Sequence, residues 1–395
     1  MRTRPAPSTL TVGPVALPDS PVLPAAIAGV AGILFVVLRL LVVARGDPSR
    51  FVVAGTTFTD PATAPHGLHI FPNNGYDGQF FYRLGLAPVR MAHTAFGIRL
   101  DTTYRLQRIG YPALAWLFTG GQHRMLPEVL IILNVVGLVV LAWLGAVLAQ
   151  DCGRHALWGL VFAAYFGAVL SLSRDLAEIV AACFALAGLI ALRRARPILA
   201  GGALAAAALT RETALVIVAA VALVRLSQMV RSKARPGRDD LAWVIPGVVF
   251  GAWQLMVKAV TGSLPARSDA GSNLSFPLTA MVGGIHHFLT LMPSKTATIW
   301  FGELIVLAVV ASLAGWSLRG SSIPAHEKLS WALMLLLLVS LSSAVWSNSA
   351  DFRAFDELFL LSWLVLLGAR RWNYVPALMT AGAWMVVAIY HVAVL

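Results

Sequence analysis

Apolar stretches of about twenty residues recur from residue 24 to the end of the chain, and no other feature constrains the fold as strongly. Only 12% of the 395 residues are charged, whereas soluble domains carry about 25%. The sequence therefore predicts an all-α, polytopic integral membrane protein with a single transmembrane domain over residues 24–395. Its about eleven spans are 24–45, 126–150, 155–172, 176–192, 198–226 as a hairpin of two, 241–260, 296–318, 329–346, 356–369 and 374–395.

Basic residues in the short loops predict the orientation. If residues 1–23 form a cytoplasmic tail, most of these arginines and lysines fall on the inner side of the membrane. Residues 46–125 then form a long first outer loop with interfacial helices, and residues 261–295 form a second large outer loop. We expect a multi-pass protein of the plasma (inner) membrane whose site faces outward. The formal charge of +12 is scattered between apolar spans rather than gathered on one face, so we expect no nucleic-acid partner.

Asp77 is the central candidate of the first outer loop. It lies between Tyr76 and a glycine, and Gln79 follows, so aromatic and amide groups are available beside a carboxylate. A glycine lets the backbone approach a ligand closely. The alternative is an Asp-Gly turn that only starts an interfacial helix. Residues 80–84, which include Tyr82, are expected to lie on the membrane surface with their aromatic rings at the interface.

The hairpin over residues 198–226 is short for two crossings. About 13 residues per pass reach about 20 Å, less than the roughly 30 Å of a hydrocarbon core. Its turn, with Arg211 and Glu212, is therefore predicted inside the bilayer depth. There the two side chains either pair structurally or line a cavity.

Other charged residues extend the set of candidates. Arg105 and Arg108 share one face of a helix at i,i+3 spacing, where they either grip a lipid-linked phosphate or bind headgroups nonspecifically. Arg353 precedes the penultimate span and can face the same cavity. Helix capping explains Asp175, but it does not explain Glu178, which lies one turn deeper.

The remaining candidates concern metals and the second outer loop. His286 and His287 point to different faces of a helix, so they are no metal pair and contact either a phosphate or the surface. Asp77, Asp175 and Glu178 leave room for a divalent metal, although no spacing demands one. No other cofactor is indicated.

Four motifs follow one another between residues 24 and 226: Tyr76-Asp77 with Phe80, Phe81 and Tyr82; Tyr111-Pro112-Ala113-Leu114; Ser171 to Glu178; and Leu209-Thr210-Arg211-Glu212-Thr213-Ala214. In order and topology they resemble the GT-C superfamily of membrane glycosyltransferases. The resemblance is closest to bacterial relatives of the GPI-anchor mannosyltransferase family that adds the second mannose. Tyrosine stands where that family has tryptophan before the Asp, and Ala214 stands where it has glycine.

The resemblance implies a GT-C-like fold and a sugar transfer with inversion. The sugar, mannose or another pentose or hexose, would pass from a polyprenyl-phosphate donor to an extracytoplasmic lipid, glycan or protein acceptor. Asp77 would be the general base, and Arg211, with Arg108 and Arg353 behind it, would stabilise the phosphate. Glu178 would orient sugar hydroxyls or hold Arg211. Further substrate-orienting candidates are Asp175, Tyr76, Gln79, Tyr82 and Glu212, with loop contacts from His286 and His287.

Two other functions fit the same pattern. The arginines would also suit a transporter or flippase for a lipid-linked anion, and a non-catalytic scaffold of envelope assembly needs only the spans. Membrane lipids surround the protein in every case.

Overall fold

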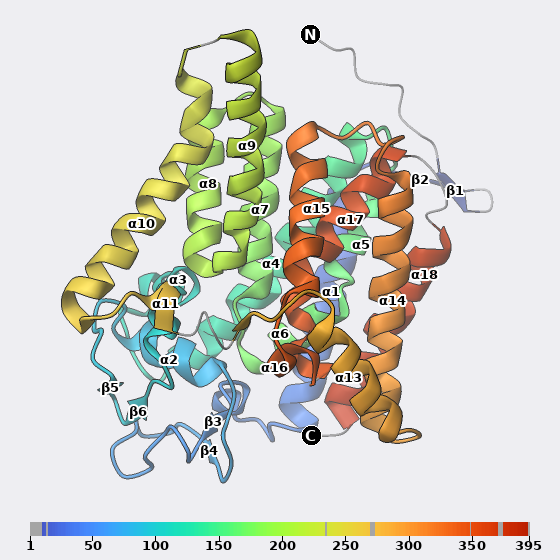
Figure 1. Cartoon of the computed structure of the whole chain (residues 1–395). Coiled ribbons are helices and arrows are strands. Elements are labelled where there is room, and N and C mark those ends of the chain that lie inside the picture. The colour runs from blue at the N-terminus through green and yellow to red at the C-terminus, as the bar shows by residue number, and fades with distance from the viewer. Residues whose placement is uncertain are drawn as a thin grey trace.

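The computed structural model describes residues 10–393, apart from 13–14, 234, 269–272, 348 and 370–373. Over these residues the chain is mostly helical with only short strands, which confirms the all-α part of the predicted fold class. The strands form three short pairs (Figure 1): β1 (Leu10–Val12) with β2 (Val15–Leu17), β3 (Ala54–Gly55) with β4 (Ile70–Phe71), and β5 (Thr94–Ala95) with β6 (Ile98–Arg99). The β3–β4 pair is parallel, and the other two are antiparallel.

Long apolar helices form most of the bundle. In the described part of the chain, six are long and apolar enough to cross a membrane: α1 (Val22–Val42), α4 (Leu126–Asp151), α9 (Leu215–Ser232) with the short turn before it, α10 (Leu241–Thr261), α14 (Lys295–Ser317) and α18 (Tyr374–Ala393). A seventh crossing results if η3 (Ala156–Gly159) and α5 (Leu160–Ala163) join α6 (Phe166–Arg174), which continues them at a bend of 58°. These helices indicate a membrane-embedded protein.

Four shorter helices complete the bundle: α7 (Glu178–Arg193), α8 (Pro197–Thr210), α15 (Ala325–Val339) and α17 (Asp356–Ala369). They lie beside the long helices in Figure 1, with α7 and α10 packed on α8, α15 on α9, and α17 on α14. With 14 to 16 residues they reach about 21–24 Å, less than the roughly 30 Å of a hydrocarbon core. Every predicted span thus contains a helix, and the number of full crossings stays a prediction.

The turn of the short hairpin falls at the predicted residues, and its depth in the bilayer stays a prediction. Helix α8 ends at Thr210, η4 (Glu212–Ala214) follows, and α9 begins at Leu215. In Figure 1 this turn stops short of the lower end of α10, and α3 (Gly110–Thr119) lies beneath it. The two segments touch closely, because a Cβ added at Gly110 would stand only 2.9 Å from the Thr210 nitrogen. The first loop therefore closes the hairpin from below.

The first loop is a packed layer at one end of the bundle. Besides its strands and α3, it contains η1 (Pro48–Phe51), α2 (Gly78–Leu86) and η2 (Thr103–Gln107). The expected surface position of residues 80–84 is wrong. Phe80 and Phe81 are only 3% exposed, because α3, α4 and the loop cover α2. The apolar surface of this layer lies instead on α3, where Leu117 and Phe118 are exposed.

The same end of the bundle carries the remaining short elements. They are α11 (Pro265–Ser268), α13 (Thr279–Thr290), α16 (Ser343–Trp346) and η6 (Ser349–Phe355), whereas η5 (Arg238–Asp240) lies before α10 at the opposite end. Figure 1 shows α2, α13 and α16 at the end of the bundle opposite to the start of α10. Which end faces the cytoplasm stays a prediction.

Candidate functional site

Asp77 is held in place by two arginines from different segments. It directly precedes α2, but its side chain does not cap that helix, so a plain helix-starting Asp-Gly turn does not account for it. Its Oδ2 lies 2.6 Å from an Nη of Arg353 and 3.0 Å from an Nη of Arg105. The neighbouring Gly78 is required by close backbone contact, since a Cβ there would stand 2.6 Å from the Val52 carbonyl oxygen.

The two arginines set the charge of Asp77. Burial alone would raise the pKa of its carboxyl, but Arg105 and Arg353 outweigh burial and hold that pKa well below its usual range. The carboxylate is therefore ionised at neutral pH.

Arg353 is the centre of the site. Its guanidinium donates to Asp77, to a close Glu178 carboxylate oxygen, and from Nε to the Tyr76 hydroxyl at 3.2 Å. It also lies over the Tyr76 ring, 5.1 Å from the ring centre. The partners come from the first loop and the start of α7, and Arg353 itself belongs to η6. One planar side chain therefore joins three distant segments. We call Asp77, Arg105, Arg353, Glu178 and Tyr76 the Asp77 cluster.

Arg211 lies next to this cluster but does not touch Asp77. One Nη donates to the Arg353 carbonyl oxygen at 3.1 Å and lies 3.5 Å from a Glu357 oxygen. The direct partner of Arg211 is Glu357 at the start of α17, and that of Glu178 is Arg353. Glu178 acts on Arg211 through its charge, so the expectation that Glu178 holds Arg211 is met only in this weaker form. The Thr213 hydroxyl also donates to Glu357, which fixes the hairpin turn against α17.

Arg108 belongs to a second group, which we call the Arg108 trio. Its Nε and an Nη donate to the two Glu212 oxygens at 2.9 and 2.6 Å, a bidentate pair. The Tyr104 hydroxyl donates to Glu212 and accepts from Arg108 at 2.9 Å. Burial raises the pKa of Tyr104 to about 12, so this group stays a neutral hydroxyl at pH 7. Glu212 thus pairs with the first loop and not with Arg211.

A cavity of about 110 Å³ lies between the Arg108 trio and the second half of the bundle. One end is polar and carries the trio, Arg211, Thr213 and Asn273. The other end is apolar and consists of side chains from α15, η6, α17 and their connections: Met334, Leu337, Leu338, Leu341, Val345, Ala354, Phe355 and Leu358. The cavity therefore offers guanidinium groups and a hydrocarbon-like wall within one space.

Two predicted substrate-orienting residues are part of the scaffold instead. The Gln79 oxygen accepts from the Gly55 nitrogen and from the Thr59 hydroxyl, both at 3.1 Å. The Tyr82 hydroxyl donates to the His123 carbonyl oxygen at 3.2 Å. Both side chains are 1% exposed, because α2 turns them away from Asp77 into the first loop.

Asp175 and the histidines also lie outside the Asp77 cluster. Asp175 ends α6 in a left-handed conformation with a φ of 50°, and its buried oxygens have no hydrogen-bond partner. Its electrostatic partner is Arg39 of α1. His286 and His287 are exposed on α13, where the His287 ring packs against Phe288.

The proposed metal ligands do not gather around one point. Asp77 and Glu178 both engage Arg353, and Asp175 is not part of that contact. Over the described residues, no group of three or more His, Cys, Asp or Glu side chains has an arrangement that could hold a metal ion.

Sequence reasoning missed three partners in these groups. Tyr104 and Glu357 were not among the candidates, and Arg105 was considered for phosphate binding rather than as a partner of Asp77. A local signal existed for Arg105, because Asp101 lies four residues before it and pairs with it at 2.8 Å.

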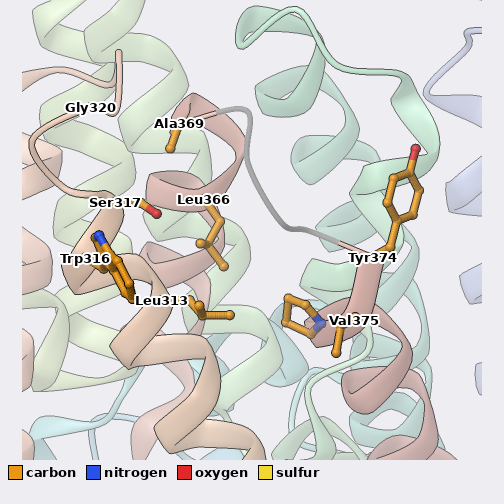
Figure 2. Close-up of a pocket in the computed structure, with 9 residues that line it drawn as sticks. Leu313, Trp316, Ser317, Gly320, Leu366, Ala369, Tyr374 and Val375 are labelled. Carbon is orange, nitrogen blue, oxygen red and sulfur yellow. The ribbon is translucent and has the colours of Figure 1, made fainter.

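A larger cavity, about 870 Å³, lies between the ends of α14 and α17 and the start of α18 (Figure 2). The figure shows Trp316, Leu313 and Tyr374 around it, with Ser317 as a polar group. None of its lining residues, all of them described, is charged. It borders Ala369, at the opposite end of α17 from Glu357, so it is not the candidate site.

No protein-family model, curated protein or solved structure matches this chain.

Proposed function

We propose that this protein is an integral membrane glycosyltransferase that uses a polyprenyl-phosphate sugar as donor and inverts the configuration of the transferred sugar. The cavity lined by the Arg108 trio and Arg211, which we call the two-ended cavity, carries the proposal, because it combines arginines with an apolar wall. Arg211 also donates to the Arg353 carbonyl oxygen, and the Arg353 guanidinium pairs with Asp77. A lipid-linked phosphate has the same two parts, an anion and a hydrocarbon tail. The acceptor is expected outside the cytoplasm, in keeping with the orientation predicted from the basic loops.

The donor phosphate fits the polar end of the cavity. Arg108 and Arg211 line it together and supply donors suited to phosphate oxygens. The isoprenoid chain then follows the apolar side chains of α15 and α17. As the glycosidic bond breaks, the phosphate leaves with the bonding electron pair, and the arginines stabilise the charge that it gains.

Asp77 is the proposed general base. The acceptor hydroxyl attacks the anomeric carbon from the face opposite the phosphate, and its proton passes to an Asp77 oxygen. Paired with both Arg105 and Arg353, the carboxylate is a weak base, since its pKa is held low. The Arg108 charge also lowers the pKa of Asp77, so a donor phosphate bound to Arg108 offsets that charge and raises the basicity of Asp77.

The experiment is sugar transfer by the purified protein in lipid nanodiscs, with a polyprenyl-phosphate sugar as donor. Asp77→Asn should lower turnover by about 10²–10⁴. Asp101→Asn is the matched control, because it makes the same chemical change at the other carboxylate that pairs with Arg105. It should stay within about tenfold of wild type, since Asp101 does not contact Arg353.

Two results would contradict the proposal. One is turnover by correctly folded Asp77→Asn within a few-fold of wild type. The other is movement of the donor across the membrane of vesicles that contain the protein and are made of the same lipids, without any sugar product. That result would favour a flippase.

A further inference from the structure

A further cavity lies between α13 and the segment that contains α16. Figure 1 shows both helices at the same end of the bundle as α2, which follows Asp77. Its volume is about 630 Å³, within the usual range for small-molecule pockets. We call it the serine-lined groove. Its polar lining side chains are Ser275, Thr279, His287, Ser342, Ser343 and Ser347. None of its lining residues, all of which are described, is Asp, Glu, Lys or Arg.

The groove and the two-ended cavity share one wall. Leu274 and Leu341 pair in an isolated antiparallel bridge, and the Ser342 nitrogen donates to the Asn273 carbonyl oxygen at 3.0 Å. Asn273 and Leu341 line the two-ended cavity, whereas Leu274 and Ser342 line the groove. Helix α16 borders both spaces as well, with Val345 lining the two-ended cavity and Ser343 lining the groove.

Ser342 is the most informative residue in the groove. It immediately precedes α16, a position where serine normally caps the helix with its hydroxyl, but here it makes no such bond. The side chain is 7% exposed, and its Oγ has no hydrogen-bond partner. A buried hydroxyl without a partner is costly, so this atom indicates a ligand that hydrogen-bonds to it.

We propose that the serine-lined groove binds an uncharged, polyhydroxylated group, the sugar part of the acceptor. Hydroxyl side chains both donate and accept, as the hydroxyls of a sugar do. A groove with no cationic lining residue does not favour a phosphate, in contrast to the arginine-lined cavity next to it. The acceptor role rests on the transferase proposal, whereas the binding of a sugar does not.

Gly283 gives a way to block the groove without disturbing the protein. It lies in the middle of α13 and lines the groove, and a Cβ added there would meet nothing within 4 Å. Gly283→Trp should therefore fill the groove while α13 is kept. Gly283→Ala changes the same residue and adds only a methyl group, so it is the matched control.

The test measures binding of soluble methyl glycosides to the protein in nanodiscs by saturation-transfer NMR. The probes are methyl mannoside, glucoside, galactoside and arabinoside. Wild type and Gly283→Ala should transfer saturation to the ring protons of at least one glycoside. Gly283→Trp should raise the Kd obtained by titrating that glycoside about tenfold, a loss of about 1.4 kcal/mol. Ser342→Ala should raise it several-fold.

An absent signal with wild type, or an equal Kd with Gly283→Trp, would overturn the proposal. The readout needs no donor, so the two proposals fail separately. Glycoside binding by a protein that transfers no sugar would refute only the transferase. Sugar transfer with an unchanged acceptor KM in Gly283→Trp would refute only the groove.

Discussion

Replacing Arg353 with methionine should destabilise the protein more than any exposed ion-pair change. Methionine keeps an apolar stem and removes the guanidinium. Asp77 retains Arg105 at 3.0 Å, whereas Glu178 loses its direct ion pair and keeps the Ser171 hydroxyl at 3.1 Å and the charges of Arg211 and Arg108. The Glu178 side chain is 4% exposed, so its charge is left buried and unpaired. Removing one partner of a buried ion pair costs about 3–5 kcal/mol, and we expect Arg353→Met to lower the free energy of unfolding by an amount in that range.

A double-mutant cycle separates this stranded charge from lost packing. Glu178→Gln removes the charge of the acid, and we expect it to cost about 1–3 kcal/mol. The double variant leaves no unpaired acid at position 178. Its loss of unfolding free energy should therefore be smaller, by about 2 kcal/mol, than the sum of the losses of the two single variants. The assay is reversible unfolding in mixed micelles, followed by tryptophan fluorescence.

Arg194→Met is the matched control for this cycle. Arg194 also pairs with a carboxylate, but its side chain is 49% exposed and that of its partner Asp151 is 33% exposed. Exposed pairs are worth about 0–1 kcal/mol, and the control should lose no more than that. A loss below about 1 kcal/mol for Arg353→Met, or additive single losses, would refute the view that Glu178 depends on Arg353.

Two further changes test how Asp77 is held. Gly78→Ala places a Cβ 2.6 Å from the Val52 carbonyl oxygen and closer still to that of Arg174, so it should lower stability by about 1–3 kcal/mol. Gly202→Ala, which meets nothing within 4 Å, should be neutral or stabilising, and equal effects in the same unfolding assay would contradict the packing argument. Because the folded pKa of Asp77 lies below its unfolded value of about 3.9, the stability advantage of wild type over Asp77→Asn should be constant above about pH 5 and be lost at lower pH. An advantage that grows on acidification would contradict the ion pairs.

The helices and the hairpin turn could be predicted because they depend on local patterns. The turn with Arg211 and Glu212 follows from the length of the apolar stretch alone. Glu178 was recognisable as more than a helix cap because it lies a turn deeper than Asp175. The structure brings Glu178 and Asp77 onto one arginine, which topology had suggested by placing both at the same end of the bundle.

The identity of that arginine could not be predicted. Arg353 and Asp77 are separated by 276 residues, and no local spacing relates them. Gln79 and Tyr82 follow Asp77 closely in sequence, yet they point away from it, because a helix changes direction by about 100° per residue. Nearness in sequence is therefore a poor guide here, because the direction in which each residue of α2 points decides which side chains reach the site. The pairing of Glu212 with Arg108 was hidden for a related reason, since it depends on the first loop packing beneath the hairpin.

The ion pairs also decide where an anionic ligand can enter. Arg105, Arg108, Arg211 and Arg353 each already face a carboxylate, so an arriving phosphate has to displace an acid rather than fill an unused position. Releasing an acid is least costly where that acid can reach water. Glu212 is 19% exposed and lines the two-ended cavity, whereas Glu357 is 4% exposed. We therefore expect a phosphate to bind Arg108 by displacing Glu212, because this exchange leaves the packing of the Asp77 cluster in place. In the proposed transfer reaction, the Arg108 trio would select the donor, and the Asp77 cluster would keep the acceptor base positioned while the donor binds.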